Sequence, residues 1–112
     1  MIKKYNKLVR DRIPEIITVD NEIPKIKILK NKEFVDELLK KLHEETKEAM
    51  VAVKNTDKEG LAKEIGDLYE IIDSLIENFS LDRNEILKLQ NERREKRGGF
   101  KEKIFLIETE TK

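Results

Sequence analysis

Two long segments with helical periodicity, separated by a short polar break, constrain the fold of this chain more than any other feature. The first segment spans about residues 32–54 and the second runs from about residue 57 to Phe79. Apolar residues recur at three- and four-residue intervals in both, which places them on one face of each helix. Only Asn55-Thr56-Asp57 lies between the segments, so the two helices must run antiparallel and in contact.

Shorter elements flank this helical pair. Pro14 suits the first turn of a short helix that continues to Val19, and another helix is expected over residues 83–97. Segments 24–29 and 104–107 are rich in aliphatic residues, which predicts two short strands able to pair with each other. The predicted fold class is therefore all-α, an antiparallel helical bundle with short extended N- and C-terminal segments.

Residues with capping chemistry mark the predicted helix ends. Asn31 is the expected N-cap of the first long helix, and Thr56 with Glu59 matches a capping box for the second. Asp82 is the expected N-cap of the helix over residues 83–97. Gly98 suits the left-handed position that ends that helix.

The second long helix carries an apolar arc too wide for a single neighbour to cover. This width predicts either a central place in a bundle or an interface with another copy of the chain. With 112 residues, the chain has room for one domain, residues 1–112. We therefore expect an oligomer, a homodimer or homotetramer, to complete the bundle. The arc comprises Leu61, Ala62, Ile65, Leu68, Tyr69, Ile71, Ile72, Leu75, Ile76 and Phe79.

The composition excludes several classes of function. The absence of cysteine rules out disulfides, thiol catalysis and cysteine-based zinc sites, and a single histidine, His43, rules out a multi-histidine metal site. Lys and Arg balance Asp and Glu at 24 each, so no basic field predicts nucleic-acid binding. No apolar run approaches the length of a membrane span, so we expect a cytoplasmic protein without a membrane partner.

Two acidic clusters lie on the two long helices. The first is Glu44-Glu45-x-x-Glu48 and the second is Glu64-x-x-Asp67. At about 100° per residue, Glu45 and Glu64 fall within the apolar arcs, Glu48 and Asp67 flank them, and Glu44 lies outside. Unpaired carboxylates at a helix interface are costly, so this arrangement predicts a bound cation.

The choice of cation follows from the ligand chemistry. A cluster of oxygen ligands without sulfur or imidazole suits Mg²⁺, with Mn²⁺ as the alternative. A di-iron bundle would need Glu-x-x-His pairs, which the chain does not contain. The remaining alternative is a helical interaction module whose carboxylates are simply solvated.

The pattern Glu-Glu-x-x-Glu, a gap, and Glu-x-x-Asp resembles the MazG-like family of all-α nucleoside triphosphate pyrophosphohydrolases. That superfamily also includes phosphoribosyl-ATP pyrophosphohydrolase and the dimeric dUTPases. The opening Lys7–Ile17, KLVRDRIPEII, and the closing Lys96–Phe100, KRGGF, resemble a small stand-alone branch of the family.

The resemblance implies Mg²⁺-dependent hydrolysis of a nucleotide between its α and β phosphates, in a role such as removing unwanted nucleotides. It implies Glu45, Glu48, Glu64 and Asp67 as metal ligands, with Glu44 in the same acidic site. A metal-activated water would attack phosphorus in line. Phosphoribosyl-ATP hydrolysis is the alternative enzymatic function.

Basic residues near both ends of the chain are candidates for binding the substrate's phosphates, because arginine contacts phosphate through two parallel hydrogen bonds. Those on the last helix have an ordinary alternative role as solvated cations at a helix C-terminus. The candidates are Arg10, Arg12, Lys88, Arg93, Lys96 and Arg97.

Overall fold

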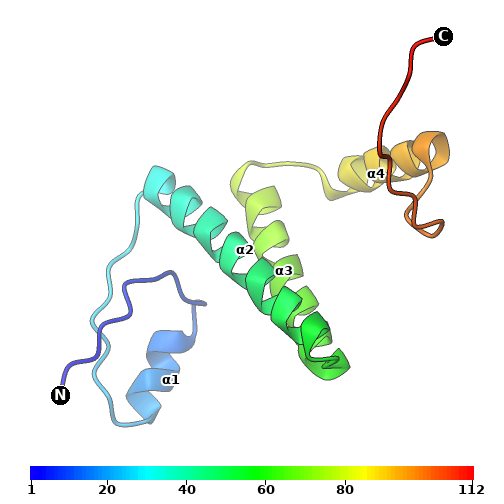
Figure 1. The fold of residues 1–112 in the computed structure, drawn as a ribbon. Helices are drawn as coiled ribbons and strands as arrows, with labels where there is room; N and C mark the ends of the chain where they lie inside the picture. The colour runs from blue at the N-terminus through cyan, green and yellow to red at the C-terminus, as the bar shows by residue number, and fades with distance from the viewer.

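The computed structural model describes residues 1–112 and contains four α-helices and no strand (Figure 1). The all-α fold class is confirmed, and each predicted helix is present within one or two residues of its predicted bounds. None of the helices is long and apolar enough to span a bilayer. The helices are α1 (Ile13–Val19), α2 (Asn31–Lys54), α3 (Lys58–Asn78) and α4 (Arg83–Arg97).

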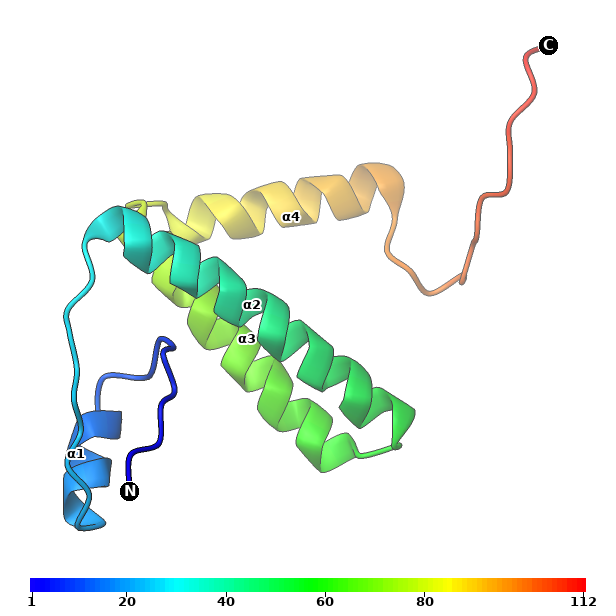
Figure 2. The same cartoon turned by 60° about the vertical axis from the view of Figure 1, so that its left-hand side comes forward.

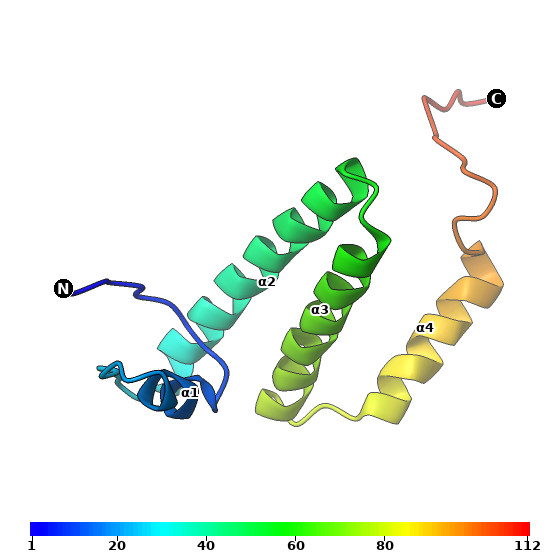
Figure 3. The same ribbon diagram turned by 90° about the horizontal axis from the view of Figure 1, so that it is seen from below.

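The centre of the fold is the antiparallel hairpin of α2 and α3. The two helices lie side by side along their length in both Figure 1 and Figure 2, whereas α4 leads away from them. Figures 1 and 2 show α1 set apart from the hairpin, and the view from below shows the C-terminal segment projecting beyond α4 (Figure 3). The hairpin is therefore the only extensive helix–helix interface within one chain.

The turn between α2 and α3 is capped one residue later than predicted. Asp57, not Thr56, is the N-cap of α3, and its carboxylate accepts a hydrogen bond of 2.9 Å from the Gly60 backbone N–H. Thr56 has φ +53°, a left-handed backbone that turns the chain and cannot place its hydroxyl at the cap position. Gly60 has no Cβ, and this leaves the space that the Asp57 carboxylate occupies.

The remaining helix ends are partly as expected. Asn31 is the first residue of α2, and Lys30 takes the N-cap position with extended backbone and no side-chain cap, so the predicted Asn31 cap is wrong. Asp82 caps α4 as predicted, accepting a hydrogen bond from the Asn84 backbone N–H. Gly98 ends α4 with φ +80°, a positive value that glycine adopts without strain.

The two predicted strands do not form. Segments 24–29 and 104–107 are irregular, with Ile28 and Ile107 almost fully exposed. They lie at opposite ends of the molecule (Figure 1), so neither provides the other with backbone partners. An extended segment becomes a strand only when another strand satisfies its N–H and C=O groups.

Little apolar surface is buried within one chain. Leu38 and Ala52 of α2 and Ile71 of α3 are the only buried residues. The radius of gyration is 19.2 Å, whereas a compact chain of this length would have about 13 Å. On α3, the outer part of the wide apolar arc remains exposed, with Tyr69 at 65% and Phe79 at 54%.

The cap at the start of α3 provides a test of the hairpin. Replacing Asp57 with Ala should lower the free energy of unfolding by about 1 kcal/mol, because the Gly60 N–H loses its acceptor. Thr56→Ala is the matched control and should change stability little, because Thr56 makes no cap. Urea unfolding followed by circular dichroism measures both variants. A larger loss for Thr56→Ala than for Asp57→Ala would contradict the assignment.

Candidate metal centre

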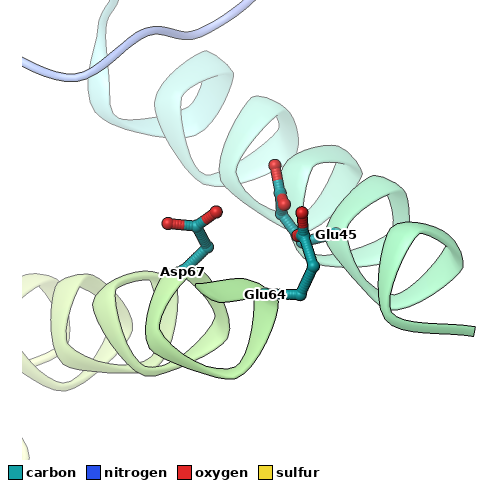
Figure 4. A group of neighbouring side chains, drawn as sticks. All are labelled: Glu45, Glu64 and Asp67. Carbon is teal, nitrogen blue, oxygen red and sulfur yellow. The ribbon is translucent and has the colours of Figure 1, made fainter. Parts of the chain in front are cut away.

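Three of the predicted carboxylates meet in the groove between α2 and α3. Glu45 comes from the middle of α2, and Glu64 and Asp67 come from successive turns of α3. One oxygen from each of the three lies within 4.8 Å of the others. Figure 4 shows the three side chains converging from the two helices. All three are half-buried, so the groups are partly withdrawn from water.

The position of the cluster follows from the helical periodicity. Glu45 lies between the buried residues Leu38 and Ala52 along α2, and Glu64 and Asp67 precede the buried Ile71 on α3. The hairpin packing that buries these apolar side chains therefore also brings the carboxylates together. Glu45 and Glu64 are half-buried, as expected for residues that lie within the apolar faces of their helices.

The electrostatics of the cluster favour a bound proton or cation. The pKa of Glu45 is raised from 4.5 to about 7, mainly by a side-chain hydrogen bond with Glu64, then by burial, and then by the charges of Glu64 and Asp67. Lys41, one turn earlier on α2, opposes this shift of the pKa. Two carboxylates can share a hydrogen bond only when one of them is protonated.

One oxygen of the cluster lacks a partner. Oε2 of Glu64 is buried and accepts no hydrogen bond, an arrangement that costs free energy when the carboxylate is charged. Either the proton shared with Glu45 or a cation between the carboxylates would satisfy this atom. The three half-buried oxygen donors thus fit a divalent cation that prefers oxygen ligands.

The other two predicted carboxylates lie outside the cluster. Glu44 and Glu48 are exposed on α2, and neither belongs to the group of converging oxygens. Glu48 is one turn beyond Glu45, so its side chain is a neighbour of the site along the helix. The roles predicted for Glu44 and Glu48 stay predictions.

Of the predicted phosphate-binding residues, only Arg10 contacts the cluster. Its Nη2 atom donates a hydrogen bond of 2.8 Å to Oδ1 of Asp67. Arg12 is paired with Glu15 instead. The four candidates on α4 are exposed and have no ion pair with the cluster; they are Lys88, Arg93, Lys96 and Arg97.

Two neighbours of the cluster were not expected from the sequence. Lys41 lies four residues before Glu45, which makes the two side chains neighbours on α2. Arg10 was proposed as a phosphate ligand and not as a partner of Asp67. No local pattern links residues separated by 57 positions, so the sequence held no signal for that pair.

Comparison with known families identifies the chain. A family model described as phosphoribosyl-ATP pyrophosphohydrolase matches residues 3–94, which include all three cluster residues. This chain belongs to the phosphoribosyl-ATP pyrophosphohydrolase family. A phosphoribosyl-ATP pyrophosphatase of Clostridium novyi (strain NT) is 37% identical to it over 75 residues, which are 66% of this chain and 67% of that protein. No solved structure matches the chain.

Membership of the phosphoribosyl-ATP pyrophosphohydrolase family makes the chain a pyrophosphohydrolase. The family lies in the all-α NTP pyrophosphohydrolase superfamily that the sequence motifs resemble. The MazG-like branch within that superfamily is not the family that matches, so this finer assignment stays a prediction.

The raised pKa of Glu45 predicts how the stability of the metal-free protein depends on pH. Between pH 4.5 and about 7, folded Glu45 retains a proton that the unfolded chain has released. The folded state then binds more protons, so its stability relative to the unfolded state falls as the pH rises. This contribution is fully present below pH 4.5 and is lost as the pH rises through about 7.

The measurement is thermal unfolding in EDTA across this pH range, with Glu45→Gln as the control. The glutamine can still hydrogen bond with Glu64 but does not titrate. We expect the melting temperature of the wild type to fall relative to that of Glu45→Gln between pH 5 and 7. Parallel pH profiles for the two proteins would show that Glu45 titrates normally.

Proposed function

We propose that this chain hydrolyses the bond between the α and β phosphates of its nucleotide substrate, releasing pyrophosphate, with Mg²⁺ as the cofactor. Mn²⁺ would be expected to substitute. The observation that carries the proposal is the convergence of Glu45, Glu64 and Asp67 around a buried, unpartnered carboxylate oxygen. The cluster lies within the matched residues 3–94, which is where a family activity should reside.

The substrate that the comparisons favour is phosphoribosyl-ATP. The matching family model and the similar Clostridium novyi protein both carry that activity in their names. Hydrolysis of its triphosphate at the same position would give phosphoribosyl-AMP and pyrophosphate. This is the alternative that the sequence left open, and it is now better supported than the hydrolysis of ordinary nucleoside triphosphates.

One observation keeps nucleoside triphosphates as a second candidate. The family match ends at residue 94, before the Lys96–Phe100 motif that resembles stand-alone MazG-like enzymes. Those enzymes remove unwanted nucleotides, and both substrates present the same triphosphate group to the carboxylates. The two candidates therefore share the same reaction and differ in the nucleoside that the rest of the protein must recognise.

The carboxylates of the hairpin would each have a part in this reaction. Glu45, Glu64 and Asp67 would hold the Mg²⁺, whose charge offsets that of the phosphates and lowers the pKa of a bound water. Glu48 would be recruited as a further ligand from the neighbouring turn of α2. Glu44, exposed on α2 beside the site, would orient the attacking water or accept its proton.

The substrate's phosphates need additional cations. Arg10 is already beside the cluster, and Arg12 follows two residues later in the turn before α1. Lys88, Arg93, Lys96 and Arg97 lie on α4, which packs against neither helix of the hairpin extensively. These four residues would serve the site only if α4 or the α4 of another copy approached it.

A homo-oligomer, dimer or tetramer, would complete this open fold. The exposed part of the α3 arc includes Ile65, Tyr69, Ile72 and Phe79. Burying such side chains stabilises an interface by roughly 25 cal/mol per Å² of apolar surface. A chain with only three buried residues has little core of its own, so a second copy is the natural source of the missing contacts.

Glu64→Gln tests the metal site. We expect pyrophosphate release to fall by about a hundredfold or more, since even residues that only support metal ligands cost 10- to 100-fold. The metal-free variant should melt at or above the temperature of the wild type, because the substitution relieves repulsion with Glu45 and Asp67. Mg²⁺ should raise the melting temperature of the wild type but not that of the variant.

The assay is pyrophosphate release from phosphoribosyl-ATP and from a panel of ribo- and deoxynucleoside triphosphates. Glu70→Gln, an exposed carboxylate on the same helix, is the matched control and should retain activity. Wild-type turnover by Glu64→Gln would rule out the cluster as the active site. Faster turnover of any nucleoside triphosphate than of phosphoribosyl-ATP would favour the second candidate.

The oligomer can be tested on the exposed face of α3. Ile72→Glu should shift the mass measured by light scattering from an oligomer toward the monomer, because it places a charge within the apolar surface. Glu77→Lys, exposed on the same helix, changes the charge outside the apolar arc and should leave the mass unchanged. A monomeric wild type at micromolar concentration would reject the proposal.

A further inference from the structure

One side-chain hydrogen bond connects the N-terminal segment to the hairpin. Arg10 and Asp67 form this contact across 57 residues of sequence, whereas the next most distant side-chain hydrogen bond, between Arg83 and Asp73, spans 10. The backbone hydrogen bonds around α1 are all local. The N-terminal segment, coloured blue in Figure 4, passes the cluster on the side of Asp67.

The position of Arg10 is determined by the folded turn that precedes α1. The backbone N–H of Ile13 donates a hydrogen bond of 3.0 Å to the carbonyl of Arg10, and Pro14 then begins the helix. Leu8 and Ile13 on either side are half-buried. The guanidinium is therefore presented from an ordered turn, and its path to Asp67 is short.

The ion pair and a bound metal would compete for the Asp67 carboxylate. Asp67 is one of the three residues whose oxygens lie within 4.8 Å of one another, and Arg10 already forms an ion pair with it. A divalent cation among these carboxylates would repel a guanidinium at 2.8 Å from Asp67. The pair is also easily broken, since the side chains of Arg10 and Asp67 are 56% and 41% exposed.

We propose that Arg10 is a built-in counter-cation for Asp67, which the metal displaces and which thereby becomes free to bind the substrate's phosphates. The inference rests on the proposed function. The guanidinium of Arg10 suits this exchange, because its planar set of N–H donors binds a carboxylate or a phosphate in the same geometry. Metal binding and phosphate binding would then be coupled through one residue.

The first test is the affinity for Mg²⁺ alone, measured by isothermal titration calorimetry at pH 8. Arg10→Ala should bind Mg²⁺ about two- to five-fold more tightly than the wild type, since the competing exposed ion pair is gone. Arg12→Ala removes the same charge two residues away, where it pairs with Glu15, and should leave the affinity unchanged. Arg10→Lys retains the charge and should restore an affinity near that of the wild type.

The second test is the binding of inorganic pyrophosphate, the product common to both candidate substrates, in saturating Mg²⁺. Arg10→Ala should weaken this binding by roughly tenfold or more, since it removes charge-assisted hydrogen bonds. Arg10→Lys should recover only part of the loss, because an ammonium group cannot contact phosphate through two parallel bonds. Unchanged pyrophosphate binding by Arg10→Ala would overturn the proposal that the displaced Arg10 binds the substrate's phosphates.

The two tests separate this inference from the proposed function. A wild type that neither binds Mg²⁺ nor releases pyrophosphate with it would remove the proposed function. A wild type that does both, with Arg10→Ala binding Mg²⁺ no more tightly than Arg12→Ala, would overturn the proposal that the metal displaces Arg10. It would leave the proposed function in place. Circular dichroism spectra of the variants check that the helices are intact.

Discussion

The mutual repulsion of carboxylates at the α2–α3 interface is the constraint on which the site depends. The hairpin can pack only by bringing Glu45 toward Glu64 and Asp67, because the same helix faces carry the buried Leu38 and Ile71. A hydrogen bond with Glu64 raises the pKa of Glu45 to about 7, and Arg10 pairs with Asp67. Both interactions offset part of the negative charge that the helix packing concentrates.

This constraint links the fold to the chemistry of the family. A pyrophosphohydrolase must place concentrated negative charge next to the phosphates of its substrate, which is unfavourable unless a metal bridges the two. The hairpin provides a rigid pair of helices for that purpose, since functional groups on helices are held more precisely than those on loops.

The small number of buried residues has a different cause from the repulsion between the carboxylates. Only three residues are buried, while apolar side chains on α3 and in the terminal segments remain exposed. The chain therefore has more apolar surface than its own helices cover, and the proposed oligomer would remove part of that surface from water. The separation of α4 from the hairpin fits the same interpretation, as a helix without a partner in its own chain.

Local sequence determined the helices and most of the acidic cluster. Periodicity predicted α2, α3 and α4 within one or two residues, and the same periodicity placed Glu45, Glu64 and Asp67 toward one another, because a helix converts spacing directly into direction. The helical periodicity did not distinguish Glu48 from the carboxylates that converge. Glu48 lies at the edge of the apolar arc, and a side chain at an edge can point either way.

Tertiary structure decided what depends on a partner distant in the sequence. Segments 24–29 and 104–107 have the residues of strands, but a strand needs a second strand beside it and neither segment has one. Thr56 and Asp57 can both cap a helix, and the path of the turn selected Asp57. The pairing of Arg10 with Asp67 arose only from the route of the N-terminal segment past the hairpin. The sequence by itself thus determined the helices and the carboxylates that face each other, whereas the three-dimensional path of the chain determined which cation meets them.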